Sequence, residues 1–381
     1  MSWEKTTIGE HCTVTSSKRF HLSDRTNCGV PFYCSKEIIQ KVKSEEIDNC
    51  DYISEEFYEA VAQKYGVPQE NDLLVTTRGT IGVPYLYKKS DRFYFADGNL
   101  TWMKDFQSTL LPQYLYYWFL SHEGQSKIDS IAKGTAQKAV PIAGIKTLEL
   151  LLPPIEIQCR IADILSAYDV LIENNRKQIK LLEEAAQRLY KEWFVDLRFP
   201  GYEHAKITDG VPEGWHKALL GDIIDVKYGK DHKGIPDGTI PVYGSGGLMR
   251  KCDRALCDGE SVLIPRKGSL NNIIYLDERF WTVDTMFYTE LKKPNIGLFL
   301  YFSLKTLDMY SMNIGAAVPS MTTAILNTME VVLPDDSLLG RFQRLTKNNF
   351  NAIKTLSVQS ELASQARDRL LPKLMSGEVE V

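Results

Sequence analysis

The chain has 381 residues, a length that predicts two or three folding units rather than a single core. Hydrophobic residues make up 44% and charged residues 25%, the proportions of an ordinary globular protein rather than a disordered one. The formal net charge of -4 argues against a protein that coats nucleic acid by bulk charge, although it leaves room for local basic clefts.

The composition also predicts where the chain works. No apolar run approaches the ~18 residues that span a bilayer, and the polar start MSWEKTTIGEHC predicts no signal peptide. We therefore expect a cytoplasmic protein without a membrane partner. The seven cysteines lack a CxxC pair, and no histidine lies at zinc-finger spacing, so we expect reduced thiols and no metal site. They are Cys12, Cys28, Cys34, Cys50, Cys159, Cys252 and Cys257.

In chain order, the two halves repeat the same series of patterns. A tryptophan and a glycine open each copy, as Trp3 and Gly9 and then as Trp215 and Gly221. Each copy continues with a β-like run that ends in a basic residue, a glycine and a hydroxyl residue. The two runs are DLLVTTRGTIG at 72–82 and SVLIPRKGSLN at 261–271.

The same order continues to the end of each copy. An aromatic cluster with an aspartate (FYFADG, FWTVDT) precedes an aromatic helix-like stretch (YLYYWFLS, GLFLYFSL), whose aromatic side chains we expect in the core. A small-residue loop (KGTAQKAVP, IGAAVPS) and a strand ending in proline (LELLLPP, MEVVLPD) close both copies. The repeated order predicts a tandem duplication of two like domains, each followed by a helix.

A long helical pattern follows each domain. Apolar or small residues recur in steps of four and three, which is typical of a coiled-coil seam. Asn175 interrupts the first seam, where a single polar residue fixes register at a cost in stability. The predicted seam positions are Ile161, Leu165, Tyr168, Ile172, Asn175, Ile179, Leu182, Ala186, Leu189 and Trp193, and then Phe342, Leu345, Asn349, Ala352, Leu356, Gln359, Ala363, Ala366 and Leu370.

Each helix of about 40 residues would extend roughly 60 Å. Two such helices in one chain are expected to pair in antiparallel orientation and hold the domains at opposite ends; the alternative is that each helix packs only on its own domain. The predicted fold class is α+β, with two α/β domains in a pseudo-twofold tandem repeat joined by two long antiparallel coiled-coil helices. The predicted boundaries are 1–154, 155–198, 199–334 and 335–381.

Several segments resemble the specificity subunit of Type I restriction-modification systems. They are LPPIEIQCRIADILSAYDVLIENNRKQIKLLEEAAQRLYKEWFVDLRFPGYE, PVYGSGGL, IPRKGSLNNIIYLDERFWTVDT and LLPKLMSGEVEV. The resemblance covers essentially the whole chain. It implies that the domains at 1–154 and 199–334 are target recognition domains that read a bipartite sequence in double-stranded DNA, one half-site per domain. It implies docking of two adenine methyltransferase subunits and of restriction subunits as well. It also implies no cofactor in this chain, with S-adenosylmethionine, ATP and magnesium bound by the partners.

Motifs for catalysis are missing from the sequence. The Pro153-Pro154 pair is flanked by Leu and Ile and cannot supply the Asn/Asp-Pro-Pro-aromatic motif of an adenine methyltransferase. The glycines of YGSGG at 243–247 have neither GxGxxG spacing nor a following helical pattern, and RKGS is no P-loop. The spacing of Asp72, Asp97, Asp277 and Glu278 favours solvated turns over a nuclease cluster. We therefore expect a non-catalytic subunit.

The candidate DNA contacts lie in loops, where a basic residue beside glycine lets the backbone approach DNA while the side chain reaches guanine or phosphate. A plain turn with an exposed charge explains the same pattern equally well. The loops at 228–238 and 133–141 add lysines and a glutamine, which solubility alone would also explain. The candidates are Thr76, Thr77, Arg78, Thr80, Lys133, Gln137 and Lys138 in the first domain, and Lys230, His232, Lys233, Tyr243, Ser245, Arg266, Lys267 and Ser269 in the second.

A reading from another class also fits these patterns. Duplicated domains about a coiled coil would serve equally as a scaffold that clamps two protein partners without reading DNA.

Overall fold

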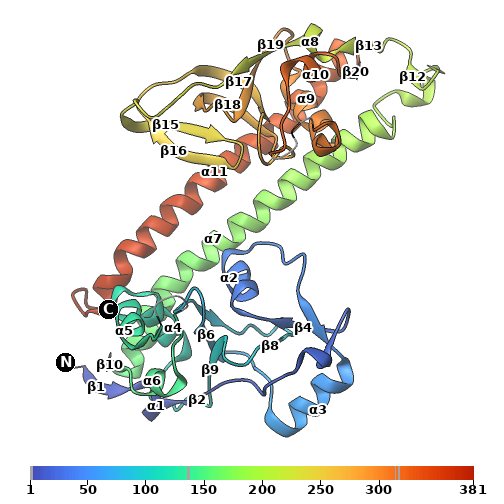
Figure 1. Ribbon diagram of the computed structural model, residues 1–381. Coiled ribbons are helices and arrows are strands. Elements are labelled where there is room, and N and C mark those ends of the chain that lie inside the picture. Colours follow the sequence, from blue (N-terminus) through green and yellow to red (C-terminus); the bar gives the residue numbers. More distant parts are fainter. Residues whose placement is uncertain (1–2, 135–137, 314, 316–317) are drawn as a thin grey trace. The chain divides into compact units, whose positions relative to one another are not determined.

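The computed structural model describes residues 3–134, 138–313, 315 and 318–381 (Figure 1). It divides into two compact units, one of Met1–Asn174 with Gln359–Val381 and one of Asn175–Val358. Both units share the two long helices, α7 (Ile155–Tyr190) and α11 (Asp336–Met375), so each contains one α/β domain and half of each helix.

The first domain contains three small sheets covered by short helices. Strand orders are β2-β9-β6-β7, β3-β5-β4-β8 and β1-β10. Its elements are β1 (Glu4–Thr7), α1 (Ile8–His11), β2 (Thr13–Thr15), η1 (Leu22–Asp24), β3 (Arg25–Thr26), β4 (Val30–Tyr33), α2 (Ser35–Lys43), β5 (Asp51–Ile53), α3 (Glu55–Tyr65), β6 (Leu73–Thr76), β7 (Pro84–Leu86), β8 (Tyr94–Phe95), β9 (Leu100–Lys104), α4 (Pro112–Leu120), α5 (His122–Ile131), α6 (Ile142–Lys146) and β10 (Glu149–Leu152).

The second domain is built on one six-stranded sheet of order β14-β19-β17-β18-β15-β16, with β13-β20 and β11-β12 as separate pairs. A π-helical turn, η2 (Lys191–Val195), leads from α7 into it. Its elements are η3 (Tyr202–His204), β11 (Ile207–Thr208), β12 (Val211–Pro212), β13 (His216–Leu219), α8 (Leu220–Ile223), β14 (Ile224–Tyr228), β15 (Asp237–Gly244), β16 (Gly247–Cys252), β17 (Cys257–Pro265), β18 (Ile274–Thr282), β19 (Met286–Leu291), α9 (Gly297–Lys305), η4 (Met309–Met312), α10 (Thr323–Asn327) and β20 (Glu330–Leu333).

The predicted duplication is confirmed. Strand β1 pairs antiparallel with β10, the last strand of the first domain, with Thr7 opposite Glu149; β13 pairs in the same way with β20, the last strand of the second, with Leu219 opposite Glu330. Each domain also contains one parallel pair among its described strands, β4-β8 in the first and β15-β18 in the second. The copies diverge after that parallel strand, because β4 leads into helix α2 whereas β15 turns back as the β15-β16 hairpin.

The aromatic stretches belong to the core, as predicted. Tyr114, Trp118 and Phe119 of α4 are buried, as are Phe299 and Phe302 of α9. A buried glutamine of a long helix holds the start of each: Gln158 Oε1 accepts from the Leu111 N–H at 2.9 Å, and Gln343 Oε1 accepts from the Leu298 N–H at 3.2 Å. The long helices are therefore joined to both domain cores through satisfied polar groups as well as through apolar packing.

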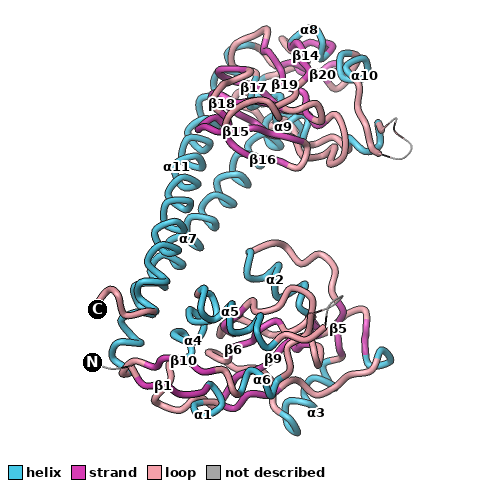
Figure 2. Tube along the Cα trace, turned by 60° about the vertical axis from the view of Figure 1, so that its left-hand side comes forward, coloured by secondary structure: helices cyan, strands magenta, loops and turns pink. Residues whose placement is uncertain are grey.

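The two long helices pair in antiparallel orientation within each unit (Figures 1 and 2). In the first unit, Arg367 of α11 donates to Asp169 of α7 at 2.5 Å, and Tyr117 of α4 donates to the same carboxylate at 2.6 Å. In the second unit, Asn175 is 3% exposed and its Nδ2 donates to the Leu356 carbonyl at 3.4 Å. Asn175 therefore binds the backbone of the opposing helix, as a register-fixing residue should.

The buried face of α7 follows the predicted seam, but that of α11 departs from it. Ile161, Leu165, Ile172 and Ala186 are buried on α7, and Trp193 is buried on the π-helical turn η2 that follows it. On α11, Leu345 is 44% exposed and Gln359 is also exposed, whereas Thr346 is fully buried. The predicted position of Leu345 is wrong because the buried face steps four residues from Phe342 rather than three. The Thr346 hydroxyl is satisfied there by donating to the Phe342 carbonyl at 2.8 Å.

Nine further seam residues are partly buried. They are Tyr168, Ile179, Leu182, Leu189, Asn349, Ala352, Leu356, Ala366 and Leu370. Within the described ranges, no helix combines the length and hydropathy of a membrane crossing. All seven cysteines are free thiols.

Candidate nucleic-acid interface

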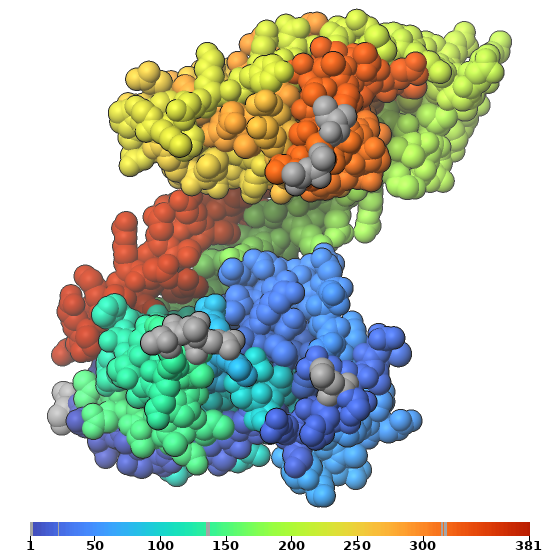
Figure 3. All heavy atoms as spheres, viewed as in Figure 1, coloured from blue at the N-terminus to red at the C-terminus, as the bar shows by residue number. Residues whose placement is uncertain are grey.

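In the second domain, four loop segments converge around Arg266 and Lys267. The Arg266 guanidinium lies 5.3 Å from the ring centroid of Tyr228, where the loop at 229–236 begins. The Tyr310 hydroxyl donates to the Gly268 carbonyl at 3.3 Å, and the Asn272 amide donates to the Ser245 carbonyl at 2.8 Å. Figure 3 shows the orange segment after α9 beside the yellow hairpin strands on one face of this domain.

Arg266 is held in place by two neighbouring groups, whereas Lys267 is exposed. A guanidinium nitrogen of Arg266 donates to the Asp284 carbonyl at 3.1 Å, and the Tyr228 ring supports the same group by a cation–π contact. Lys267 and Ser269 are exposed on the same loop. The arrangement presents positive charge from a loop whose backbone glycine, Gly268, has a φ of 84° that favours glycine.

Arg250, which the sequence reasoning missed, holds the neighbouring loop at 229–236 in its conformation. Arg250 Nε donates to His232 Nδ1 at 3.1 Å, and its terminal nitrogen donates to the carbonyls of His232 and Ile235 at 2.6 and 2.7 Å. His232 is therefore a half-buried support for the loop, whereas Lys230 and Lys233 are exposed.

Tyr243 and Ser245, which were predicted to contact DNA, make contacts within the domain instead. Tyr243 packs against the cluster around Leu263, and burial raises the pKa of its hydroxyl to about 12. Ser245 engages through its backbone, with its N–H donating to the Thr285 hydroxyl at 3.3 Å. Leu248 and Met249, just after the turn of the hairpin, are exposed.

In the first domain, Arg78 and Thr80 border an open groove of about 510 Å³. Helix α2 forms the other wall. The residues that line the groove are Ser35, Lys36, Ile39, Gln40, Lys43, Glu45, Arg78, Gly79 and Thr80. Lys133 and Lys138 are exposed on the loop that bridges to Arg78, and Lys138 pairs with Asp129 at 2.8 Å. The sequence reasoning missed the α2 wall, because Lys36 and Gln40 carry no motif.

Two first-domain predictions require correction. Thr76 is fully buried and its hydroxyl accepts from the Val83 N–H at 2.9 Å, while Thr77 is 3% exposed. Both threonine side chains therefore lie beneath the loop surface, because Thr76 still belongs to the fully buried strand β6 and Thr77 follows it directly. Gln137 lies outside the described residues.

The two basic loops share one hydrogen-bonding frame. In the first domain, Val140 N–H donates to the Thr77 carbonyl at 2.9 Å and Gly79 N–H to the Lys138 carbonyl at 3.4 Å. In the second, Met321 N–H donates to the Arg266 carbonyl at 2.9 Å and Gly268 N–H to the Pro319 carbonyl at 2.9 Å. Arg78 and Lys267 thus occupy the same position in the two copies.

Of the acidic residues that were expected in solvated turns, Asp72 departs from the expectation. Asp72 is buried, which raises the pKa of its carboxyl group, and it accepts from Trp102 Nε1 at 2.7 Å. Asp277 pairs with Lys347, and Glu278 pairs with Lys354 at 2.6 Å. Across the part of the chain that the structure describes, no three acidic, histidine or cysteine side chains are grouped to hold a metal ion.

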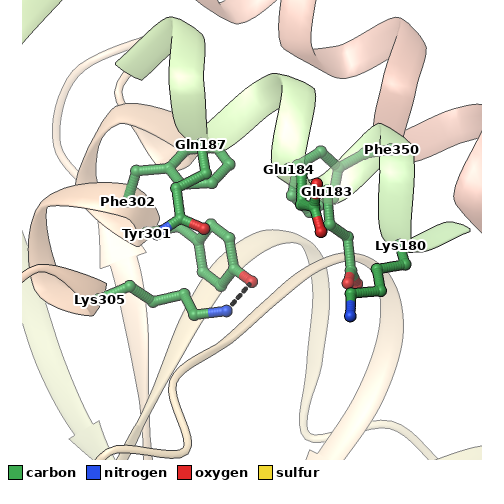
Figure 4. Close-up of a pocket in the computed structure, with 8 residues that line it drawn as sticks. All are labelled: Lys180, Glu183, Glu184, Gln187, Tyr301, Phe302, Lys305 and Phe350. Atoms are coloured by element: carbon green, nitrogen blue, oxygen red, sulfur yellow. Dashed lines mark hydrogen bonds between the residues drawn. The ribbon is translucent and has the colours of Figure 1, made fainter. Parts of the chain in front are cut away.

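A separate pocket of about 170 Å³ lies between α7, α9 and α11 in the second unit (Figure 4). Lys305 donates to the Tyr301 hydroxyl at 3.1 Å there. The other lining residues are Lys180, Glu183, Glu184, Gln187, Phe302 and Phe350. Its volume is below the ~300 Å³ of typical small-molecule sites, and the lining is that of a junction between packed helices.

The fold is thus a tandem pair of like domains with matching basic loops, joined by long antiparallel helices. The family profile described as "Type I restriction modification DNA specificity domain" matches residues 1–184 and 212–354. The chain therefore belongs to the Type I restriction-modification DNA specificity family.

Relatives and a solved structure agree with this assignment. The specificity subunit of the MjaVIII Type I restriction enzyme from Methanocaldococcus jannaschii is 28% identical over 413 residues, covering 100% of this chain and 93% of that protein. The MjaIX specificity subunit of the same organism is 26% identical over 346 residues, covering 81% and 78%. The crystal structure of a Type I S subunit from M. genitalium has the same fold, with a TM-score of 0.67 at 19% identity over 98% of this chain and 96% of that one.

Proposed function

We propose that this chain is the DNA-recognition subunit of a Type I restriction-modification complex. Each domain reads one half-site of a bipartite sequence in double-stranded DNA, and the paired helices set the number of base pairs between the half-sites. The observation that carries the proposal is the basic loop built twice in one frame, with Arg78 and Lys267 at matching positions. Side chains beside glycine can fork to guanine or phosphate, which is how loops position a protein on DNA.

The same proposal assigns protein partners to the helices. Large apolar side chains are exposed on both, namely Val170, Leu171 and Leu362 in the first unit and Leu181, Leu345 and Val358 in the second. Large apolar side chains that stay exposed along paired helices offer a surface on which a protein partner can pack. We assign this surface to two adenine methyltransferase subunits, which in turn hold the restriction subunits.

Chemistry is assigned to those partners. S-adenosylmethionine, ATP and magnesium would be bound by the methyltransferase and restriction subunits, and this chain would supply sequence recognition in the cytoplasm. Its loops offer exposed positive charge, such as Lys133, Lys233 and Lys267, which is what a role in DNA binding requires.

The test is to map methylated adenines genome-wide in a host that expresses this chain with its methyltransferase. The expected result is one bipartite motif, with a methylated adenine in each half-site. A host with active methyltransferase but no shared motif would contradict the proposal.

The second candidate is a scaffold that clamps protein partners without reading DNA. The exposed apolar residues of α7 and α11 favour it as much as they favour methyltransferase docking. The two are separated by a gel-shift experiment, in which the purified chain and methyltransferase either retard a bipartite duplex or do not.

A further inference from the structure

The two domains differ at one position of their shared frame, and this difference concerns how each reads DNA. In the first domain, Ala96 N–H donates to the Tyr33 carbonyl at 2.8 Å; in the second, Val283 N–H donates to the Tyr243 carbonyl at 3.0 Å. Each tyrosine begins a Tyr-x-Ser triplet that ends in Ser35 or Ser245. The triplets therefore occupy the same place, beside the basic loop.

The segment that follows the triplet is different in each copy. In the second domain it is the turn of the β15-β16 hairpin, whereas in the first it is the nine-residue helix α2. Helix α2 and the hairpin turn differ although the backbone hydrogen bonds around them are the same, and both lie beside the basic loop. We therefore expect this segment to make the two domains prefer different DNA sequences.

Helix α2 is anchored firmly on its inner side. Glu37 accepts from the Cys34 N–H at 2.8 Å, and Ser35 and Glu37 are both buried with Ile38. Lys41 pairs with Asp91 at 2.9 Å. Because these contacts fix the orientation of the helix, the opposite side is presented in one defined direction.

That opposite side forms the wall of the groove. It carries Lys36, Gln40 and Lys43, spaced four and three residues apart and thus on one face of the helix. Arg78 of the basic loop lies across the groove, and Glu45 is the one carboxylate among the lining residues. The groove thus combines the positive charges of Lys36, Lys43 and Arg78 with the amide of Gln40. The major groove of DNA is wide enough to admit an α-helix such as α2.

We propose that α2 is the base-reading helix of the first domain and that Gln40 is a specificity-determining residue. This inference rests on the proposed function and names the contact for one of its half-sites. A glutamine amide pairs with adenine through its N6 and N7 atoms, whereas a lysine beside it neutralises phosphate. Lys36 and Lys43 are assigned to phosphates, and Gln40 to a base edge.

The test uses the assembled complex of this chain with its methyltransferase subunits. Gln40→Ala is expected to relax one base position in one half-site, with about tenfold to hundredfold loss of discrimination there, and to leave the other half-site unchanged. Lys36→Ala is expected to weaken binding on all sequences alike and to lower the slope of log affinity against log salt by about 0.9. Lys64→Ala, an exposed lysine at the end of α3, is the matched control.

Methylated-adenine mapping and salt-dependent gel shifts supply the readouts, and the thermal unfolding midpoint of each complex verifies folding. A folded Gln40→Ala complex with an unchanged motif would overturn the inference, as would equal relaxation at both half-sites. If the wild-type complex itself methylates no bipartite motif, the proposed function fails instead, so the two failures are distinguishable.

Discussion

Replacing Arg266 and Lys267 together by alanine is the most direct test of the second domain's loop. The double change removes two positive charges from one turn and leaves the frame intact, because the Arg266 carbonyl and the Gly268 N–H still bind the loop ending at Met321. We expect weaker or relaxed recognition of one half-site, while the half-site read by the first domain is retained.

The structure sets the expected magnitudes. Losing the Arg266 bond to Asp284 and its contact with Tyr228 costs about 2 kcal/mol of unfolding free energy at most, since a hydrogen bond contributes about 1 kcal/mol and a partly exposed cation–π pair about 0.5–1 kcal/mol. A domain with several kcal/mol of stability therefore stays folded. If both cations bind phosphate, the salt slope of DNA binding falls by about 1.8.

The assay combines gel shifts of the methyltransferase-bound chain across a salt series with genome-wide mapping of methylated adenines. The control replaces Lys206 and Lys217, two exposed lysines of the same unit that lie outside the loop, and so removes the same charge. Equal loss at both half-sites by a folded complex would refute the reasoning. So would a control that lowers binding as much as the loop variant.

Three further predictions follow from the helices and the overall charge. Inserting one heptad in each of α7 and α11 lengthens both helices by about 10 Å, or about three base pairs. The gap between the half-sites of the methylated motif should grow accordingly, and an unchanged gap would refute the proposal that the helices set it. Gln158→Ala removes a fully buried side chain that also donates to Thr109 and Pro153 carbonyls at 2.8 Å, so urea unfolding should show a loss of about 2–4 kcal/mol; exposed Arg160→Ala is its control, and similar midpoints for both would contradict the assignment. With a net charge of -4, the chain alone should bind DNA weakly, and nanomolar selective binding without methyltransferase in a titration would contradict this.

The repeat and the long helices could be predicted because their signals are local and periodic. Trp3, Gly9 and their counterparts Trp215 and Gly221 recur in order, and the four-three spacing from Ile161 to Trp193 follows directly from helix geometry. Asn175 was predictable for the same reason. Periodicity fixes which side of a helix is apolar before any partner is known.

Contacts across the chain decided the rest. Leu345 and Thr346 both fit the spacing from Phe342, and only packing against the rest of the second unit buried the threonine in place of the leucine. The sequence placed Thr76 in a loop, but in the structure its hydroxyl accepts a hydrogen bond from the N–H of Val83 and is buried. The wall of the groove, Lys36 and Gln40 on α2, lies about forty residues from Arg78 in sequence, and no local pattern records that proximity. Sequence periodicity determined the architecture, whereas long-range hydrogen bonds and packing decided which side chains face outward, because burial depends on partners that are distant along the chain.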